Sequence, residues 1–97
     1  MRESLDEPVS VILLYNATHR YAQPYRLHWQ SRDYTLGKVD FYHKTHKGDT
    51  LMHHFSLGDV DGTAYFKLGF NATTLQWTIE EYMTADQLEV TYNHDAA

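Results

Sequence analysis

Apolar and polar residues alternate with a period of two along most of the chain, in short runs separated by turn residues. This alternation is typical of β-strands that bury one face. Where it changes parity at Gly37-Lys38, we expect a β-bulge that bends the strand sharply. The predicted inward sets are Tyr25, Leu27 and Trp29; Tyr34 and Leu36; Val39 and Phe41; Leu51, His53, Phe55 and Leu57; Ala64, Phe66, Leu68 and Phe70; and Leu75, Trp77 and Ile79.

Turn residues join these runs into antiparallel hairpins. We expect a loop at Ser31-Arg32, a three-residue loop at Lys47-Gly48-Asp49, and turns at residues 58–62 and 71–74. The inward sets fix the register, because a slip of one residue would expose the apolar face. The expected cross-strand neighbours are Trp29 and Tyr34, Val39 and Leu57, Phe41 and Phe55, Phe55 and Phe66, and Leu68 and Trp77.

A meander of five strands with one apolar face must curl or find a cover. We therefore predict a mainly β fold, a single small antiparallel meander forming a strongly bent sheet or SH3-like half-barrel. Val9–Tyr15 is apolar on both faces and predicts a further strand that closes the sheet. Thr84–Gln87 has capping-box spacing, so at most a short helical turn precedes Leu88–Tyr92. We expect one domain over 8–92, with flexible ends at 1–7 and 93–97.

The composition and the lack of known motifs exclude several classes of protein. The 97 residues include no cysteine, which excludes disulfides and thiolate sites. The longest apolar run, Val9–Tyr15, is too short for a membrane helix, and the acidic residues Asp6 and Glu7 before it are unlike a signal peptide. These features predict a cytoplasmic protein with no membrane segment. No motif for a cofactor or a catalytic group is present, so we expect no cofactor and no enzyme activity.

The charge is unevenly distributed. The net charge is −5, yet residues 19–47 carry +4 and the remainder −9. On the expected outer face, aromatic and basic side chains form rows typical of single-strand nucleic-acid binders. An alternative is that these side chains simply suit a solvated sheet face and pair their charges across strands. The candidate nucleic-acid contacts are Tyr42, His54, Tyr65, Lys67 and Arg26.

Seven histidines make metal binding a hypothesis. The expected register places His43 opposite His53 at the open end of the inner face. Two imidazoles would hold zinc only with a third ligand, such as His46 or Asp49. The alternative, which we favour, is a stacked and partly exposed histidine pair without a metal. Asp59–Gly62 resembles the start of a calcium loop, but Leu68 stands at the position of the closing glutamate, which favours a hairpin turn.

Residues 25–82 resemble small bacterial all-β proteins catalogued as domains of unknown function. The residues that carry the resemblance are Tyr25-Arg26-Leu27, Trp29, Tyr34-Thr35, the hairpin from His43 to Leu57, and Leu75 with Trp77–Glu81. These residues belong to the expected core and turns, so the resemblance implies a shared fold and assigns no catalytic residue.

The first functional hypothesis is a non-catalytic interaction module. It would bind a protein partner or a second copy, forming a homodimer, through Val9–Tyr15 or a sheet edge. The alternatives are a single-stranded nucleic-acid-binding domain and a small histidine metal-binding protein.

Overall fold

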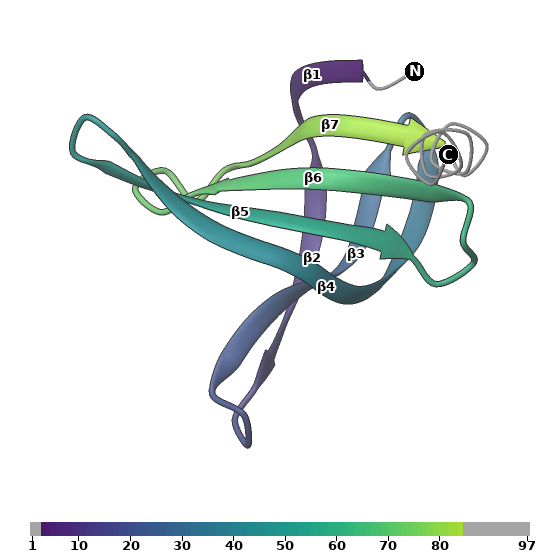
Figure 1. The fold of residues 1–97 in the computed structure, drawn as a ribbon, viewed down its shortest axis with the longest axis horizontal. Helices are drawn as coiled ribbons and strands as arrows, with labels where there is room; N and C mark the ends of the chain where they lie inside the picture. The colour runs from purple at the N-terminus through teal and green to yellow at the C-terminus, as the bar shows by residue number, and fades with distance from the viewer. Residues whose placement is uncertain (1–2, 85–97) are drawn as a thin grey trace, which may run out of the picture.

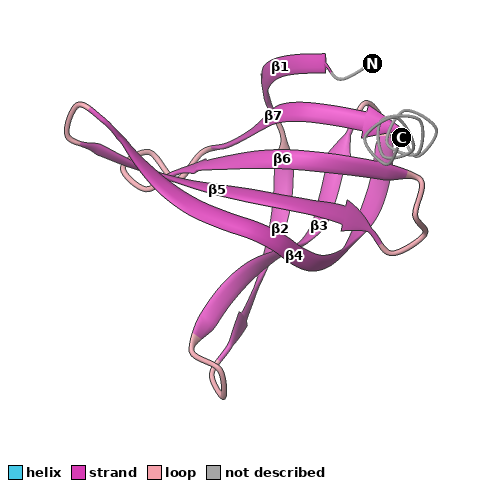
Figure 2. Cartoon of the chain, viewed as in Figure 1, coloured by secondary structure: helices cyan, strands magenta, loops and turns pink. Residues whose placement is uncertain are grey.

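Seven β-strands and no helix form from residues 3–84, which are the residues that the computed structural model describes (Figure 2). Since these residues include no helix, they supply none that could cross a membrane. One antiparallel sheet has the order β1-β7-β6-β5-β4-β3-β2, so β3 to β7 form the predicted five-stranded meander (Figure 1). The strands are β1 (Glu3–Pro8), β2 (Ser10–Asn16), β3 (Tyr21–Trp29), β4 (Arg32–Lys47), β5 (Thr50–Asp59), β6 (Ala64–Asn71) and β7 (Trp77–Thr84).

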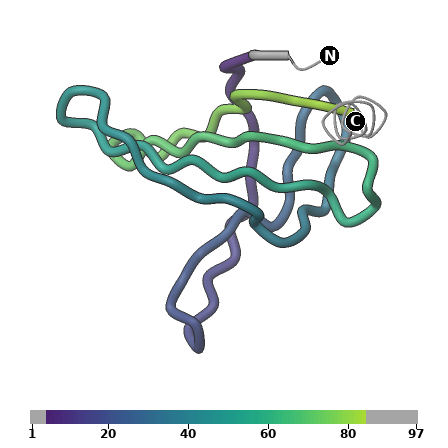
Figure 3. The backbone as a smooth tube through the Cα atoms, in the orientation of Figure 1, coloured from purple at the N-terminus to yellow at the C-terminus, as the bar shows by residue number. Residues whose placement is uncertain are grey.

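The two edges of the sheet belong to one stretch of chain. β1 pairs with β7 and β2 pairs with β3, yet only Val9 separates β1 from β2 along the chain. In Figure 3 this purple stretch runs from β7 at the top to the β2–β3 hairpin at the bottom, which shows how far the sheet is rolled. The strand expected at Val9–Tyr15 is confirmed as β2, but it forms one edge of the sheet instead of closing it. Residues 3–7, expected as part of a loose end, instead lie in β1; the expected helical turn and residues 93–97 fall outside the described residues.

β4 carries both the predicted bend and an unpredicted one. The register shifts between Leu36 and Val39, which confirms the parity change at Gly37-Lys38. A second shift follows between Val39 and Phe41 and places Phe41 opposite Ser56 rather than Phe55. The prediction that Phe41 is inward is therefore wrong, and its side chain is 58% exposed. Tyr42 takes the inner position instead, because a bulge reverses the alternation beyond it.

Three hairpins differ from the expected register by two residues. Gln30 and Ser31, both with positive φ, form the β3–β4 turn, so Leu27 rather than Trp29 lies opposite Tyr34. In the same way, Phe66 pairs with Leu57 instead of Phe55, and Leu68 with Ile79 instead of Trp77. A two-residue slip keeps every side chain on its face. The predicted inner face therefore survives these errors.

The core lies where the rolled sheet brings its inner residues together. Partly buried residues pack against it, among them Val39, Phe70 and Trp77. Besides Phe41, two residues of the predicted inward sets are outside. Tyr25, beside a register shift in the β2–β3 ladder, is 41% exposed. Leu75, in the β6–β7 turn, is 68% exposed and has a φ of 62°. The buried apolar residues are Leu27, Trp29, Tyr34, Leu36, Phe55, Leu57, Ala64, Phe66, Leu68 and Ile79.

Asp59 closes the turn that was weighed as a calcium loop. Its carboxylate accepts hydrogen bonds from the Thr63 and Ala64 backbone N–H groups, at 2.7 and 3.2 Å, and from the Thr63 hydroxyl. Burial alone would raise the pKa of Asp59, but these hydrogen bonds outweigh it and lower the pKa below the usual 3.8. The side chain therefore caps a hairpin turn, as the sequence favoured.

Candidate functional site

The β2–β3 hairpin extends away from the body as an arm, here defined as residues 13–23 (Figure 1). Pro24, at the base of the arm, is fully buried. Within residues 3–84 no further strand flanks the hairpin beyond Pro24, since β2 ends the sheet order and β3 pairs with β4 only from Arg26 onward. Its apolar side chains are consequently exposed to an unusual degree, at 46–64%: Leu13, Leu14, Tyr15 and Tyr21.

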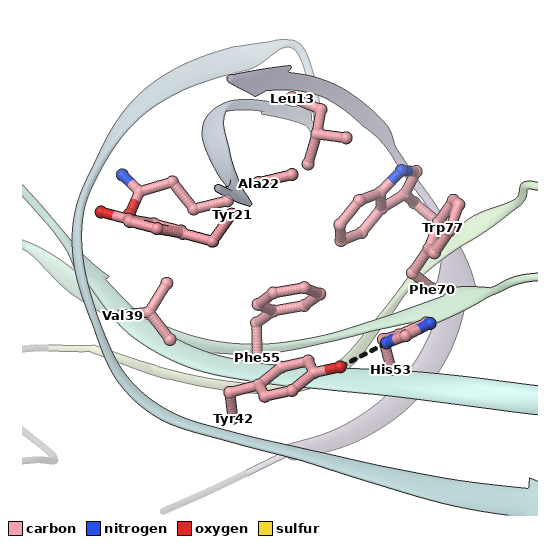
Figure 4. A pocket seen from close by; sticks show the side chains of 10 residues that line it. Leu13, Tyr21, Ala22, Val39, Tyr42, His53, Phe55, Phe70 and Trp77 are labelled. Atoms are coloured by element: carbon pink, nitrogen blue, oxygen red, sulfur yellow. Dashed lines mark hydrogen bonds between the residues drawn. The ribbon is translucent and has the colours of Figure 1, made fainter. Parts of the chain in front are cut away.

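An apolar pocket of about 510 Å³ lies between the arm and the inner face of β4 to β7 (Figure 4). The arm forms one wall with Leu13, Tyr21 and Ala22, and the sheet forms the other with an aromatic floor. None of the residues that line it is acidic or basic except His53. The lining residues from the sheet are Val39, Tyr42, His53, Phe55, Phe70 and Trp77, and Gln23 completes the arm's wall.

Ring contacts organise the aromatic floor. Trp77 lies 4.8 Å from Phe70 and 5.6 Å from Phe55, measured between ring centroids. Tyr42 lies 5.0 Å from Phe55 on the other side. Such offset and tilted ring pairs hold each other in place, so the floor is ordered without an occupant.

The polar feature of the pocket is a pair of side chains, Tyr42 and His53. The Tyr42 hydroxyl is hydrogen-bonded to His53 Nδ1 at 2.5 Å, and the two rings stack (Figure 4). Burial lowers the pKa of His53 below the usual 6.5, and the charges of Lys44 and His54 lower it further. The imidazole is therefore neutral at pH 7. We assign the Tyr42 hydroxyl as the donor to Nδ1, which leaves the Nε2–H group available to a bound molecule.

The predicted metal pair does not form. The β4–β5 turn contains two residues, Gly48 and Asp49, rather than three, so His43 lies opposite His54 and Lys44 opposite His53. His43 therefore stacks on His54 on the outer face, with ring centroids 4.6 Å apart, while His53 faces the pocket. Residues 3–84 contain no group of three or more side chains suited to hold a metal ion.

On the outer face, a hydroxyl, an imidazole and a carboxylate are connected in line. The Thr45 hydroxyl lies 2.7 Å from His54 Nε2, and His54 Nδ1 lies 3.0 Å from both carboxylate oxygens of Glu80. This order of groups activates hydroxyl nucleophiles in many hydrolases. Here Thr45 is exposed on the outer face and the pocket lies on the inner face, so the three groups do not meet a bound molecule there.

A β-bulge and a glycine create this contact. The register passes from Leu68↔Ile79 to Lys67↔Glu81, which leaves Glu80 as the extra residue. In a regular strand Glu80 and Glu81 would point to opposite faces, but the bulge places both outside, where the Glu81 carboxylate lies 3.1 Å from the Lys67 ammonium. At Gly69 a methyl group would lie 2.7 Å from a Glu80 carboxylate oxygen. Glycine therefore leaves the space through which Glu80 reaches His54.

The predicted nucleic-acid face is not assembled as a unit. Tyr42 lines the pocket, and the Lys67 ammonium is paired with Glu81. Burial, the Asp40 charge and a hydrogen bond to Asp40 raise the pKa of Tyr65 to about 12, so its hydroxyl is held by a carboxylate. Of the remaining candidates, His54 contacts Glu80, and Arg26 lies on β3 opposite Thr35, three strands away from Tyr65 and Lys67 on β6.

The sequence reasoning missed the pocket because it missed the second bulge in β4. The predicted register points Phe41 inward and makes the inner face a continuous apolar core. In the observed register Tyr42 points inward instead, and its hydroxyl bonds to His53 among aromatic rings. A signal was present in Asp40-Phe41-Tyr42, where an apolar residue on either parity left two registers possible.

Comparison with known proteins adds no relative to this picture: no family model, no curated protein and no solved structure matches the chain.

Proposed function

We propose that this protein is a non-catalytic binding module whose ligand site is the apolar pocket between the arm and the sheet. The observation that carries the proposal is the pocket itself: about 510 Å³ of space bounded by aromatic side chains, with one Tyr–His pair as its polar feature. Small-molecule sites in proteins have this size and composition, and a group with a shifted pKa often marks them.

The pocket is suited to a planar apolar molecule. Phe55, Phe70 and Trp77 present ring faces and edges to it, and Leu13 closes it from the arm. Removing such a molecule from water supplies most of the binding free energy, at roughly 25 cal/mol per Å² of apolar surface. The His53 Nε2–H group supplies one directional contact.

A neutral aromatic probe, 2-naphthamide, tests this function. Titration followed by NMR should shift the Trp77 indole and His53 ring signals, with a dissociation constant at or below about 1 mM for a ligand of this size. Ala22→Trp fills the pocket from the arm and should weaken binding at least about tenfold. Ala17→Trp, in the turn at the arm's tip, adds the same side chain outside the pocket and should leave binding unchanged. Equal binding by both variants contradicts the proposal.

A second candidate function is self-association through β2. β2 is an edge strand, and Ile12, Leu14 and Tyr15 are 56%, 49% and 64% exposed. An exposed apolar edge is suited to pairing with another strand. This supports the binding surface expected at Val9–Tyr15, with a homodimer as its product.

Self-association is tested by a point substitution, because deleting β2 would also remove part of the arm that lines the pocket. Sedimentation of the unmodified chain should show a dimer, and Ile12→Lys should convert it to a monomer, since a lysine on an edge strand opposes pairing. Lys38→Met, at an exposed position on β4 away from the arm, serves as the control and should leave the dimer intact. A monomer at all concentrations would exclude this candidate.

A further inference from the structure

Lys44 lies on the inner face beside the pocket, and among residues 3–84 it has no ion-pair partner. Lys44 lies directly opposite His53 in the β4–β5 ladder, and side chains directly opposite each other project from the same face of a sheet. Lys44 therefore stands on the pocket's face, one position beyond Tyr42 in the alternation. Its charge is also one of the causes that lower the pKa of His53, which agrees with this proximity.

No carboxylate within residues 3–84 forms an ion pair with Lys44; the described ion pairs involve His28, His54 and Lys67. The arm, which forms the other wall of the pocket, contains no acidic residue, because none occurs between Pro8 and Arg32. Two acidic side chains of the meander are engaged on the outer face: Asp40 with Tyr65 and Glu80 with His54. The rim of the pocket is thus apolar and positive at once.

On this basis, and resting on the proposed function, we propose that the pocket binds an apolar ring-containing molecule that carries one carboxylate. The rings occupy the space among Phe55, Phe70 and Trp77, and the carboxylate lies at the rim toward Lys44 and the His53 Nε2–H group. An N–H donor and an ammonium together satisfy a carboxylate well, because hydrogen bonds to a charged acceptor are the stronger kind.

The position of the carboxylate follows from the cost of burial. A carboxylate among the aromatic floor would lose its hydration without compensation, which costs several kcal/mol. At the rim it keeps part of its hydration and gains two partners. A neutral molecule of the same shape would fill the pocket equally well but would leave the charge of Lys44 without a counterpart.

The matched probes 2-naphthoate and 2-naphthamide test the ligand class, because they share ring system and size and differ in charge. In the full chain at low salt, 2-naphthoate should bind about fivefold more tightly than 2-naphthamide, and added salt should reduce the difference. Lys44→Met should bring the ratio close to one. Lys47→Met, three residues further along β4 and therefore on the opposite face, makes the same change in net charge and should preserve the ratio.

The outcomes separate the two proposals. If both probes bind equally in the unmodified chain, or if Lys44→Met leaves the preference intact, the carboxylate inference is overturned while the pocket remains a binding site. If neither probe shifts the Trp77 and His53 signals, the proposed function itself is overturned. A preference for 2-naphthoate that Lys44→Met abolishes and Lys47→Met retains supports both.

Discussion

Replacement of Phe66 by alanine is expected to reduce the free energy of unfolding by about 3–5 kcal/mol, the usual cost of emptying a buried phenylalanine position. Phe66 is 0% exposed. Its ring lies 4.9 Å from Tyr34, 5.7 Å from Tyr82 and 6.5 Å from Trp29, between centroids. Because the three contacts come from β3, β4 and β7, its loss loosens the roll of the sheet as a whole.

Phe41→Ala is the matched control, because it removes the same side chain from an exposed position on β4. It should cost less than about 1 kcal/mol, as expected for a substitution outside the core. Urea denaturation of both variants gives the two free energies. Equal losses would mean that Phe41 is as buried as its sequence pattern predicted, and that the second bulge in β4 does not exist.

The inner face could be predicted because β-structure preserves parity. The expected pairing of Phe66 with Phe55, instead of the observed pairing with Leu57, is an error of two residues that leaves both side chains inside. The length of a turn was the source of such errors. Gln30 and Ser31 adopt positive φ, although neither is a glycine, so nothing in the sequence favoured this pair over the expected Ser31-Arg32 as the turn.

Single-residue errors were harder to avoid and had larger consequences. The bulges at Asp40-Phe41 and at Glu80 each reverse the faces of the residues that follow, and neither coincides with a glycine or proline. Their positions are decided by long-range packing rather than local propensity. The candidate sites were most affected. His43 and His53 were predicted on one face but lie on opposite faces, and Tyr42 was predicted on the outer face but lines the pocket.

The pocket could not be predicted from the sequence, because it forms between two segments that only the roll of the sheet brings together. Leu13 and Ala22 are ordinary strand residues, and only the roll of the sheet brings them opposite Phe55 and Trp77. The sequence nonetheless identified the doubly apolar Val9–Tyr15 as unusual. That feature is explained by the structure, since one face of this stretch lines the core and pocket while the other remains exposed.

Deletion of residues 1–8 is expected to reduce the free energy of unfolding by at least about 3 kcal/mol, although the sequence predicted a flexible end at 1–7. The deletion removes β1 from the edge of β7 and uncovers the core beside Leu5. It also removes Glu7, whose carboxylate accepts a hydrogen bond from the Trp29 indole N–H at 3.2 Å. A hydrogen bond to a charged group contributes about 1.5–3 kcal/mol, and lost strand pairing and apolar burial add to it.

Glu7→Ala separates the Trp29 contact from the strand pairing, because it removes the carboxylate and leaves the β1 backbone in place. Its cost should account for about half of the loss caused by the deletion. Urea denaturation at low protein concentration, with Trp fluorescence as the signal, measures both. If the shortened chain unfolds at the same urea concentration as the full chain, then β1 does not stabilise the sheet, and β2 and its arm do not need an anchor at the opposite edge.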